Sequence, residues 1–430
     1  MGYTLSQAAI IALSIFIITY IFIILEKIHR TIVAIIGGLL MIVFGVLTQE
    51  QAIDHIDFNT IGLLIGMMVI VSIASETGLF HYIAIWSAKK VKADPIKLLI
   101  ILSLITAFGS AFLDNVTTVL LIVPMTFNIT NRLNINPVPY LLGEVFASNI
   151  GGTATLIGDP PNMMIGSAVK ELTFLSFMNN LAPVCFLVLL VTIGILAFLF
   201  RKQLTTSAVL KEKLLALDEK KEITNAVLLK KCLFVLLITI VGFFFHPLLH
   251  VETAVIALLG AFILLLWTGG EYLESALKKV EWTTLFFFIG LFVIVGGLVE
   301  TGLISALGKK AIEITGGNVT IASFLILWLS AIVSAFVDNI PFVSTMIPLV
   351  QTMGDLGIKN LEPLWWSLSL GACLGGNGTL IGASANLIVA GLAAQLGVKI
   401  TFTSFLKIGF PLMLISILIS SVYIYLRYLW

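Results

Sequence analysis

Long apolar segments dominate the chain, and their lengths match the thickness of a lipid bilayer. A helix needs about 20 mainly apolar residues to span the ~30 Å hydrocarbon core of a membrane. Two regions, 97–169 and 320–396, are apolar but interrupted by polar, Gly and Pro residues. Full crossings are predicted at 6–25, 31–48, 59–78, 181–200, 229–245, 251–268, 283–303 and 407–427. The pattern predicts an all-α polytopic membrane protein.

Each interrupted region predicts a helical hairpin followed by a broken crossing. In the first region, segments 97–113 and 117–130 would form the arms of a re-entrant hairpin, with Asp114 and Asn115 at its tip. Residues 139–169 would then form one crossing that unwinds in its middle, because Gly permits non-helical backbone and Pro prevents helix continuation. The second region predicts the same arrangement.

The two halves of the chain are related by an internal repeat. Segment 57–80 aligns with segment 281–304 at an offset of 224 residues, and ten of the 24 paired residues are identical. The same offset aligns SAFLDN with SAFVDN and TLIGDPPN with TLIGASAN. Such repeats are typical of transporter folds. Each half contains five crossings, and because five is an odd number, the second half is expected to be inserted upside down.

A hydrophilic linker, residues 201–231, separates the predicted repeats 1–200 and 232–430. Loops that carry Lys and Arg stay cytoplasmic. The predicted topology places 19 of the 24 Lys and Arg residues on the side of the linker, and eight of the 19 lie in the linker itself. The remaining 11 still outnumber the five on the other side. We therefore expect a cytoplasmic linker and outside termini, in a prokaryotic cell membrane.

Composition and short motifs exclude several classes of function. The chain is 59% hydrophobic and 11% charged, which leaves little for a soluble domain, and its net charge of +1 gives no basic excess for nucleic acid. It lacks the GxxxxGK[ST] and GxGxxG phosphate-binding patterns, so it is not expected to hydrolyse ATP itself. Cys185, Cys232 and Cys373 are too far apart for a disulfide framework or a zinc site. No cofactor is expected beyond a coupling ion.

Two aspartates are the strongest candidates for ion binding inside the membrane. Asp114 and Asp338 hold equivalent repeat positions, and each is followed by an asparagine, Asn115 or Asn339, at a predicted helix start. A charge in the bilayer core is costly and therefore needs a partner or a function. These four residues predict a site for H⁺ or Na⁺. The alternative is that the two aspartates only cap their helices.

Other ionisable residues in or near the spans are weaker candidates. Glu76 and Glu300 lie in matching ETGL motifs at helix ends, which is typical of interfacial caps. Glu144 has no acidic counterpart, because Leu368 occupies the equivalent position, and it is a candidate proton carrier. All five histidines map to loops or helix ends and are expected to be solvated.

The breaks in the two broken crossings gather small and polar residues. Unwound backbone carbonyls coordinate cations, and half-helix N-termini suit anions. The alternative is a kinked helix whose small residues allow close packing. The candidate residues are Asn149, Gly151, Gly152, Thr153, Thr155, Gly158, Asp159 and Asn162 in the first half, and Gly375, Gly376, Asn377, Thr379, Gly382, Ser384 and Asn386 in the second.

The motifs SAFLDNVTTVLLIVP, NIGGTATLIGDPPN and DNIPFVSTMIP resemble the ArsB/NhaD group of the ion transporter superfamily, and its P-protein branch in particular. That group contains arsenite permeases and sodium/proton antiporters, and citrate and dicarboxylate carriers are more distant relatives. The resemblance implies an outer scaffold and a moving transport domain of hairpins and broken helices that works as an elevator. It also implies a homodimer and, for arsenite, a partner ATPase. The site residues it implies are Asp114, Asn115, Asn149, Thr153, Thr155, Asp159, Asn162, Asp338, Asn339, Asn377, Thr379 and Asn386.

The predicted function is therefore secondary active transport coupled to H⁺ or Na⁺, with arsenite or a related small ion as substrate. Na⁺/H⁺ antiport is an alternative, and acidic hairpin tips disfavour a di- or tricarboxylate because they repel an anion. A passive channel stays open, since channels use similar polar breaks. An intramembrane aspartyl protease would need a GxGD motif beside one aspartate, where the chain has LIGD, so an enzyme is not expected.

Overall fold

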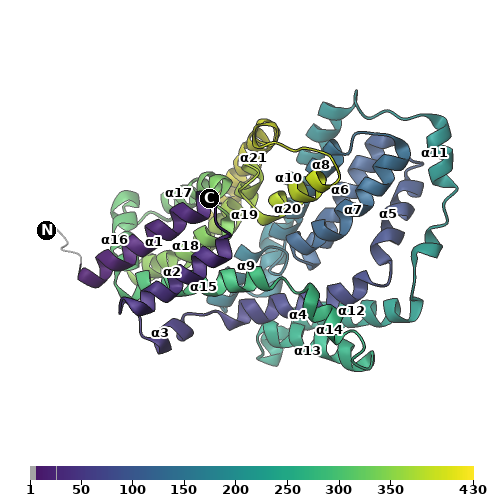
Figure 1. The fold of residues 1–430 in the computed structure, drawn as a ribbon. Helices are drawn as coiled ribbons and strands as arrows, with labels where there is room; N and C mark the ends of the chain where they lie inside the picture. The colour runs from purple at the N-terminus through teal and green to yellow at the C-terminus, as the bar shows by residue number, and fades with distance from the viewer. Residues whose placement is uncertain (1–5, 26) are drawn as a thin grey trace.

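The computed structural model describes residues 6–25 and 27–430, and every regular element in these ranges is a helix (Figure 1). Nine of the described helices are long and apolar enough to cross a membrane. They are α1 (Gln7–Leu25), α4 (Phe58–Ser75), α6 (Pro95–Phe112), α7 (Asn115–Leu133), α10 (Phe174–Phe200), α12 (Ala226–Leu249), α15 (Trp282–Glu300), α17 (Val319–Phe336), and α21 (Phe402–Ile424) with its continuation to Leu429. The predicted all-helical membrane fold is confirmed.

Shorter helices complete the fold. They are α2 (Arg30–Val43), α3 (Gln49–Asp54), α5 (Leu79–Lys90), α8 (Val138–Thr153), α9 (Pro160–Ala168), α11 (Ala208–Leu215), α13 (Thr253–Trp267), α14 (Leu273–Lys279), α16 (Leu303–Thr315), α18 (Asn339–Asp355), α19 (Glu362–Gly375) and α20 (Ser384–Gln395). Helices α2 and α13 end earlier than the crossings predicted at 31–48 and 251–268. Each is followed within two residues by a glycine with positive φ, Gly45 or Gly269, which terminates the helix. Helices α5 and α16 form where the sequence analysis placed connecting loops.

Both hairpins and both broken crossings form at the predicted residues. Helices α6 and α7 turn at Asp114, and α17 and α18 turn at Asp338. Helix α8 stops at Thr153 and the chain resumes as α9 at Pro160. In the second half, α19 passes into a short 3₁₀ turn, Gly376–Gly378, before α20 begins. In Figure 1 the α6–α7 hairpin lies to the right and the α17–α18 hairpin to the left, so the two tips approach the centre from opposite ends.

The helix boundaries repeat with the sequence. Helices α3 to α9 each begin 224 residues before their counterparts, α14 to α20. The packing is exchanged between the halves, because α4 packs on α13 while α15 packs on α2. A Cβ atom added to Gly66 of α4 would lie 2.5 Å from the carbonyl carbon of Ala257, and one added to the equivalent Gly290 would lie 2.4 Å from that of Ala34. This reciprocal contact is what a two-fold relation between the repeats requires, and their inversion across the membrane stays a prediction.

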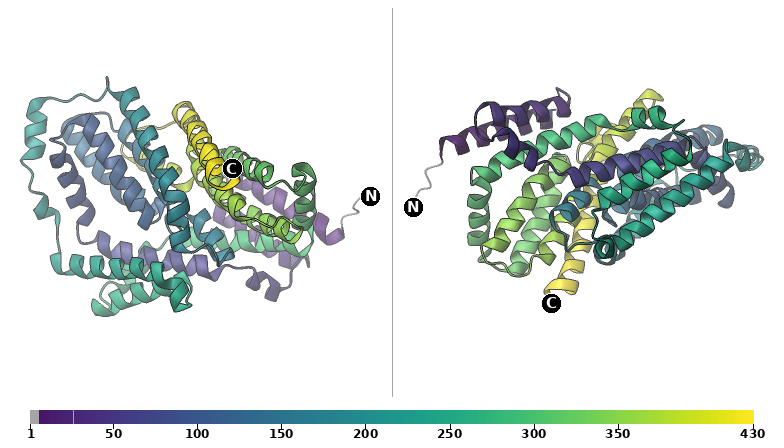
Figure 2. Two further views of the ribbon diagram at one scale, coloured as in Figure 1. Left: turned by 180° about the vertical axis from the view of Figure 1, so that it is seen from behind. Right: turned by 90° about the horizontal axis from the view of Figure 1, so that it is seen from below.

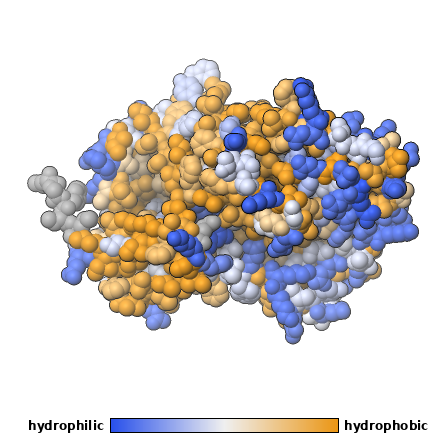
Figure 3. Space-filling model, turned by 45° about the horizontal axis from the view of Figure 1, so that its top comes forward, coloured by the Kyte–Doolittle hydropathy of each residue, from blue (hydrophilic) through white to orange (hydrophobic). Residues whose placement is uncertain are grey.

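Contacts divide the helices into two groups. Helices α1–α4 and α12–α15 pack on one another and are called the scaffold helices below. The two hairpins pack on α8–α10 and α19–α21 and are called the hairpin core (Figure 2). Figure 3 shows a broad hydrophobic surface, with hydrophilic side chains gathered at the end that carries α5 and α11. A belt of this kind is the surface expected of a protein that lies in lipid.

Close backbone contact at the scaffold crossings gives a stability test. We expect Gly290→Leu to lower the free energy of unfolding by about 1–3 kcal/mol, because the new side chain overlaps the backbone of α2. The matched control is Gly194→Leu on α10, where an added Cβ meets no atom within 4 Å. Thermal unfolding of both variants in detergent measures the difference. Equal melting temperatures for the two would contradict the crossed packing.

Candidate functional site

The two hairpin tips are built in the same way. Asp114 accepts a hydrogen bond from the Thr117 amide at 2.8 Å, and Asp338 accepts one from the Ile340 amide at 3.1 Å. Both side chains are buried, with 5% and 7% exposure. Each aspartate therefore caps its helix, as the alternative in the sequence analysis held. Capping uses one oxygen of each carboxylate, so it does not exclude ion binding by the other.

Two equivalent asparagines hold the broken crossings in their unwound form. The Asn162 side-chain amide donates to the carbonyls of Thr153 at 3.0 Å and Thr155 at 2.8 Å. The Asn386 amide donates to the carbonyls of Gly376 at 2.8 Å and Thr379 at 2.9 Å. These carbonyls lost their helical partners at the break, and lipid offers no donor in exchange. Asn162 and Asn386 thus supply hydrogen bonds that the broken helices lack.

Threonines tie each break to its own hairpin. The Thr155 hydroxyl donates to the Ala111 carbonyl of α6, and the equivalent Thr379 hydroxyl donates to the Ala335 carbonyl of α17. Thr153 donates to the Asn149 carbonyl within α8 at 2.6 Å. These three hydroxyl groups, which the sequence analysis included among the site residues, are therefore engaged with backbone in this conformation.

An asparagine network joins the two halves at the centre of the molecule. The Asn115 amide donates to Asn149 Oδ1 at 3.1 Å. The Asn149 amide donates in turn to Asn377 Oδ1 at 2.9 Å and to Asn386 Oδ1 at 3.0 Å. Asn149 has no amide counterpart, since Cys373 holds its equivalent position. The Asn149 side chain, which lies beside the first break, thereby connects the first hairpin tip with the second break.

A small cavity with both polar and apolar lining residues lies between the hairpin tips. Its volume is about 20 Å³, roughly the room for one water molecule or one small ion. Two atoms beside it, Asn115 Oδ1 and Asp159 Oδ2, are buried without a hydrogen-bond partner. The other Asp159 oxygen accepts a 3.4 Å contact from the Asn339 amide. The lining residues are Leu64, Met68, Asp114, Asn115, Val116, Asp159, Pro160, Glu281, Thr284, Asn339, Ile340 and Ser384.

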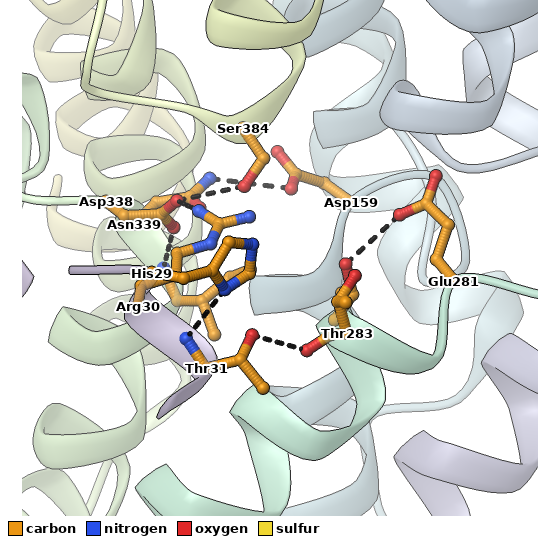
Figure 4. Close-up of polar contacts among 11 residues, drawn as sticks. His29, Arg30, Thr31, Asp159, Glu281, Thr283, Asp338, Asn339 and Ser384 are labelled. Atoms are coloured by element: carbon orange, nitrogen blue, oxygen red, sulfur yellow. Dashed lines mark hydrogen bonds and ion pairs between the residues drawn. The ribbon is translucent and has the colours of Figure 1, made fainter. Parts of the chain in front are cut away.

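The structure adds two charged residues that the sequence analysis missed. Arg30, the first residue of α2, forms an ion pair with Asp338, with 2.5 Å between Nη1 and Oδ2 (Figure 4). Ser384 donates to the same oxygen at 2.9 Å. Glu281, just before α15, lies across the site and lines the cavity. Arg30 escaped notice because it precedes the span predicted at 31–48 and was counted with the loop charges, whereas the alignment of Glu281 with Asp57 in the repeat was a signal available in the sequence.

The pKa of Glu281 is raised to about 7, first by burial and then by the neighbouring Asp114 carboxylate. The Thr284 hydroxyl, which donates to Glu281 at 3.1 Å, and the Arg30 guanidinium oppose this shift. The side chain therefore changes its charge near neutral pH. Four carboxyl groups, those of Asp114, Asp159, Glu281 and Asp338, face a single guanidinium, so the site favours cations and protons.

The remaining candidates lie outside the cavity. Glu144 is fully buried beside Thr126, which donates to one carboxylate oxygen, while the other oxygen has no partner. Glu76 pairs with Lys279 at 2.8 Å and Glu300 with His55 at 3.1 Å, both at helix ends as expected. His246 differs from the expectation of a solvated side chain, because its Nε2 atom is buried without a partner near the end of α12.

Within residues 6–25 and 27–430 no three His, Cys, Asp or Glu side chains are close enough together to hold a metal ion. Cys373 is fully buried and contacts Asn162 Oδ1 at 3.7 Å. A multidentate cage of the kind that binds a divalent transition metal is therefore not formed here. The cavity suits a proton or a monovalent cation held mainly by carboxylate, amide and hydroxyl oxygens.

Residues 20–371 match the family described as "Citrate transporter". The chain belongs to this family. An uncharacterized transporter of Mycobacterium tuberculosis is 43% identical to it over 429 residues, covering 98% of this chain and 99% of the relative. The human P protein is 35% identical over 488 residues, covering 94% of this chain and 58% of the relative. The citrate transporter family and these relatives establish a multi-pass membrane transporter.

A solved structure shows the same fold. The YdaH transporter of Alcanivorax borkumensis superposes with a TM-score of 0.62, covering 99% of both chains at 13% sequence identity. At that identity the likeness supports the architecture alone. The suspected relation to P proteins and citrate-transporter-like carriers is confirmed, and the transported ion is a separate question.

The threonine contacts at the breaks can be tested directly. We expect Thr155→Val and Thr379→Val each to lower the free energy of unfolding by about 1–3 kcal/mol, because a buried carbonyl loses its donor. Thr155→Ser and Thr379→Ser keep the hydroxyl and serve as controls, with an expected change below about 1 kcal/mol. Thermal unfolding in detergent distinguishes the pairs, and valine variants as stable as the serine variants would refute the bracing role.

Proposed function

We propose that this member of the citrate transporter family is a secondary active transporter coupled to H⁺ or Na⁺. The observation that carries the proposal is the small cavity between the hairpin tips, where Asp114 and Asp159 face Glu281 and only one guanidinium lies nearby. An acidic site of about 20 Å³ suits a bare cation or a proton. Asp114, Asn115, Asp338 and Asn339 are the proposed ligands of the coupling ion.

The charge of the site argues against a bare carboxylate substrate. Citrate carriers need positive groups or bound cations to offset the charge of their substrate. Here the nearest guanidinium, Arg30, is already paired with Asp338. Cation exchange of the Na⁺/H⁺ type therefore fits best, and arsenite and citrate, favoured by the resemblance and by the family name, are the substrates that the test must include.

The division into scaffold helices and hairpin core supports an elevator movement. The hairpin core contributes four helices to the cavity lining, namely α7, α9, α18 and α20. Helix α7 packs on α20, and α18 packs on α9. The scaffold contributes only α4 and the start of α15 to the lining. The core is proposed to move as one body past the scaffold, carrying the site with it.

The first test is transport by the purified protein in liposomes that contain a pH-sensitive dye. Na⁺, Li⁺, K⁺, arsenite and citrate are added in turn. We expect Na⁺ or Li⁺ to drive proton movement, and Asp114→Asn and Asp338→Asn to reduce the rate at least about tenfold by removing a charge from the site. Asp355→Asn, at the exposed end of α18, is the matched control. Proton movement driven by none of these solutes would refute proton coupling, and no uptake of labelled Na⁺ in the same liposomes would then overturn the proposal.

The pH dependence of cation binding follows from Glu281. Its pKa of about 7 means that the carboxylate is charged above neutral pH and protonated below it. The cation concentration for half-maximal transport should therefore rise by roughly tenfold as the pH falls from one unit above to one unit below that value.

Glu281→Gln should flatten this dependence, whereas Glu274→Gln on the exposed face of α14 should leave it intact. The measurement is the dye assay with both sides of the membrane buffered at matched pH. A wild-type curve with no change across neutral pH would exclude a role for Glu281 in cation binding.

A further inference from the structure

The scaffold holds the two hairpins in different ways. Hairpin α17–α18 is tied to the scaffold by the Arg30–Asp338 ion pair and by Tyr20 of α1, whose hydroxyl donates to the Pro341 carbonyl at 2.7 Å. Tyr20 also contacts the Thr345 hydroxyl at 3.1 Å. Across the described residues, no hydrogen bond or ion pair links hairpin α6–α7 to a scaffold helix. Among the residues that the structure describes, these polar links to the scaffold are made by the second hairpin and not by the first.

The repeat positions equivalent to Arg30 and Tyr20 explain why the two hairpins differ in their contacts with the scaffold. The positions equivalent to Arg30 and Tyr20, 224 residues later, are Ala254 and Phe244. Neither has the charge or the hydroxyl needed for the contact. Asp114, the equivalent of Asp338, is capped by the Thr117 amide and has no cationic partner in the described part of the chain. The two tip aspartates thus differ chemically, although their backbones are built alike.

The Arg30 guanidinium contacts both the scaffold and the hairpin core. Its guanidinium lies 5.0 Å above the ring of Phe287 in α15, and it points from α2 to Asp338 in the hairpin core (Figure 4). The Arg30 side chain is 23% exposed and that of Asp338 is 7% exposed. A stacked guanidinium keeps a favourable contact with the aromatic ring when its carboxylate leaves. Arg30 can therefore release Asp338 without itself becoming isolated.

Separating Asp338 from Arg30 without a replacement cation costs free energy, because the buried Asp338 carboxylate is left without a counter-charge. Its Oδ2 atom accepts from Arg30 and Ser384, and its Oδ1 atom accepts from the Ile340 amide. If the hairpin moves away from α2, the carboxylate keeps the two neutral donors and loses its counter-charge. A buried carboxylate without a counter-ion is strongly unfavourable. The movement becomes possible when another cation or a proton takes the place of the guanidinium.

We infer that Arg30 is a tethered counter-cation that competes with the transported cation for Asp338, so that loading of Asp338 breaks the ionic link between the second hairpin and the scaffold. The inference rests on the proposed cation-coupled function and deepens it. While no cation is bound, Arg30 neutralises the charge of Asp338 and ties the core to the scaffold. A cation or proton that displaces Arg30 keeps Asp338 neutralised and removes the ionic link, which leaves the neutral Tyr20 contacts between this hairpin and the scaffold. Empty movement is suppressed, as tight coupling demands.

If Arg30 competes with the cation for Asp338, removing Arg30 should make the cation bind more tightly. General damage to the structure would weaken binding instead. In the dye assay with the cation that proves active, Arg30→Gln should lower the half-maximal cation concentration at least tenfold. Arg30→Lys keeps the charge, and Arg132→Gln removes an exposed arginine at the end of α7 that donates a hydrogen bond to Asn128. Arg132→Gln should stay within threefold of the wild type, and Arg30→Lys, which keeps the charge but not the planar guanidinium, should lie between the wild type and Arg30→Gln. An unchanged or raised half-maximal concentration in Arg30→Gln overturns the inference.

A second comparison covers the case in which Arg30→Gln does not fold. If Arg30 acts only through Asp338, the variants Asp338→Asn and Arg30→Gln/Asp338→Asn must bind the cation equally, because the target of the competitor is gone. Cation-dependent shifts of the melting temperature in detergent report this binding without transport. A difference above threefold in half-maximal concentration contradicts competition at Asp338. Failure of the wild type to bind or transport any cation would instead refute the proposed function.

Discussion

Backbone carbonyls at the two helix breaks need donors from within the protein, and the rest of the site depends on how they obtain them. Hydrocarbon supplies no hydrogen bonds, so a crossing can unwind only where side chains replace the lost helical partners. Asn162 and Asn386 each donate to two such carbonyls, and Thr155 and Thr379 fasten each break to the neighbouring hairpin. Break and hairpin tip therefore form one rigid unit in each half.

This bracing explains why the polar residues of the motifs divide into two roles. Thr153, Thr155 and Thr379 donate to backbone and shape the site without facing the cavity. Asn115 and Asp159, which line the cavity between the tips, retain buried oxygen atoms without partners. Unpaired buried oxygens are costly in an interior of low dielectric constant, and a bound ion or proton offsets that cost. The same network that stabilises the fold thus prepares the site for a ligand.

The repeat gives the two halves nearly the same backbone framework, but the side chains at the site differ between them. Seven helices begin at equivalent residues in both halves, and α4–α13 packing is mirrored by α15–α2 packing. The chemistry differs at particular positions, where Arg30, Asn149 and Asp159 have Ala254, Cys373 and Ala383 as counterparts. One half thus supplies both the cation and the central amide of the site. A single asymmetric site, and not two equal ones, results from the two-fold framework.

The sequence by itself determined the helical membrane fold, the repeat, the hairpin tips at Asp114 and Asp338, and the breaks around Asn162 and Asn386. These features follow from local rules, because hydrophobic length, Gly and Pro act along the chain and a repeat offset carries them from one half to the other. Only the tertiary structure decided that Arg30 meets Asp338, 308 residues away, and that Glu281 joins the cavity. Long-range pairing across helices depends on the exchanged packing of α2 on α15 and on hairpin placement, and neither leaves a periodic signal in the sequence.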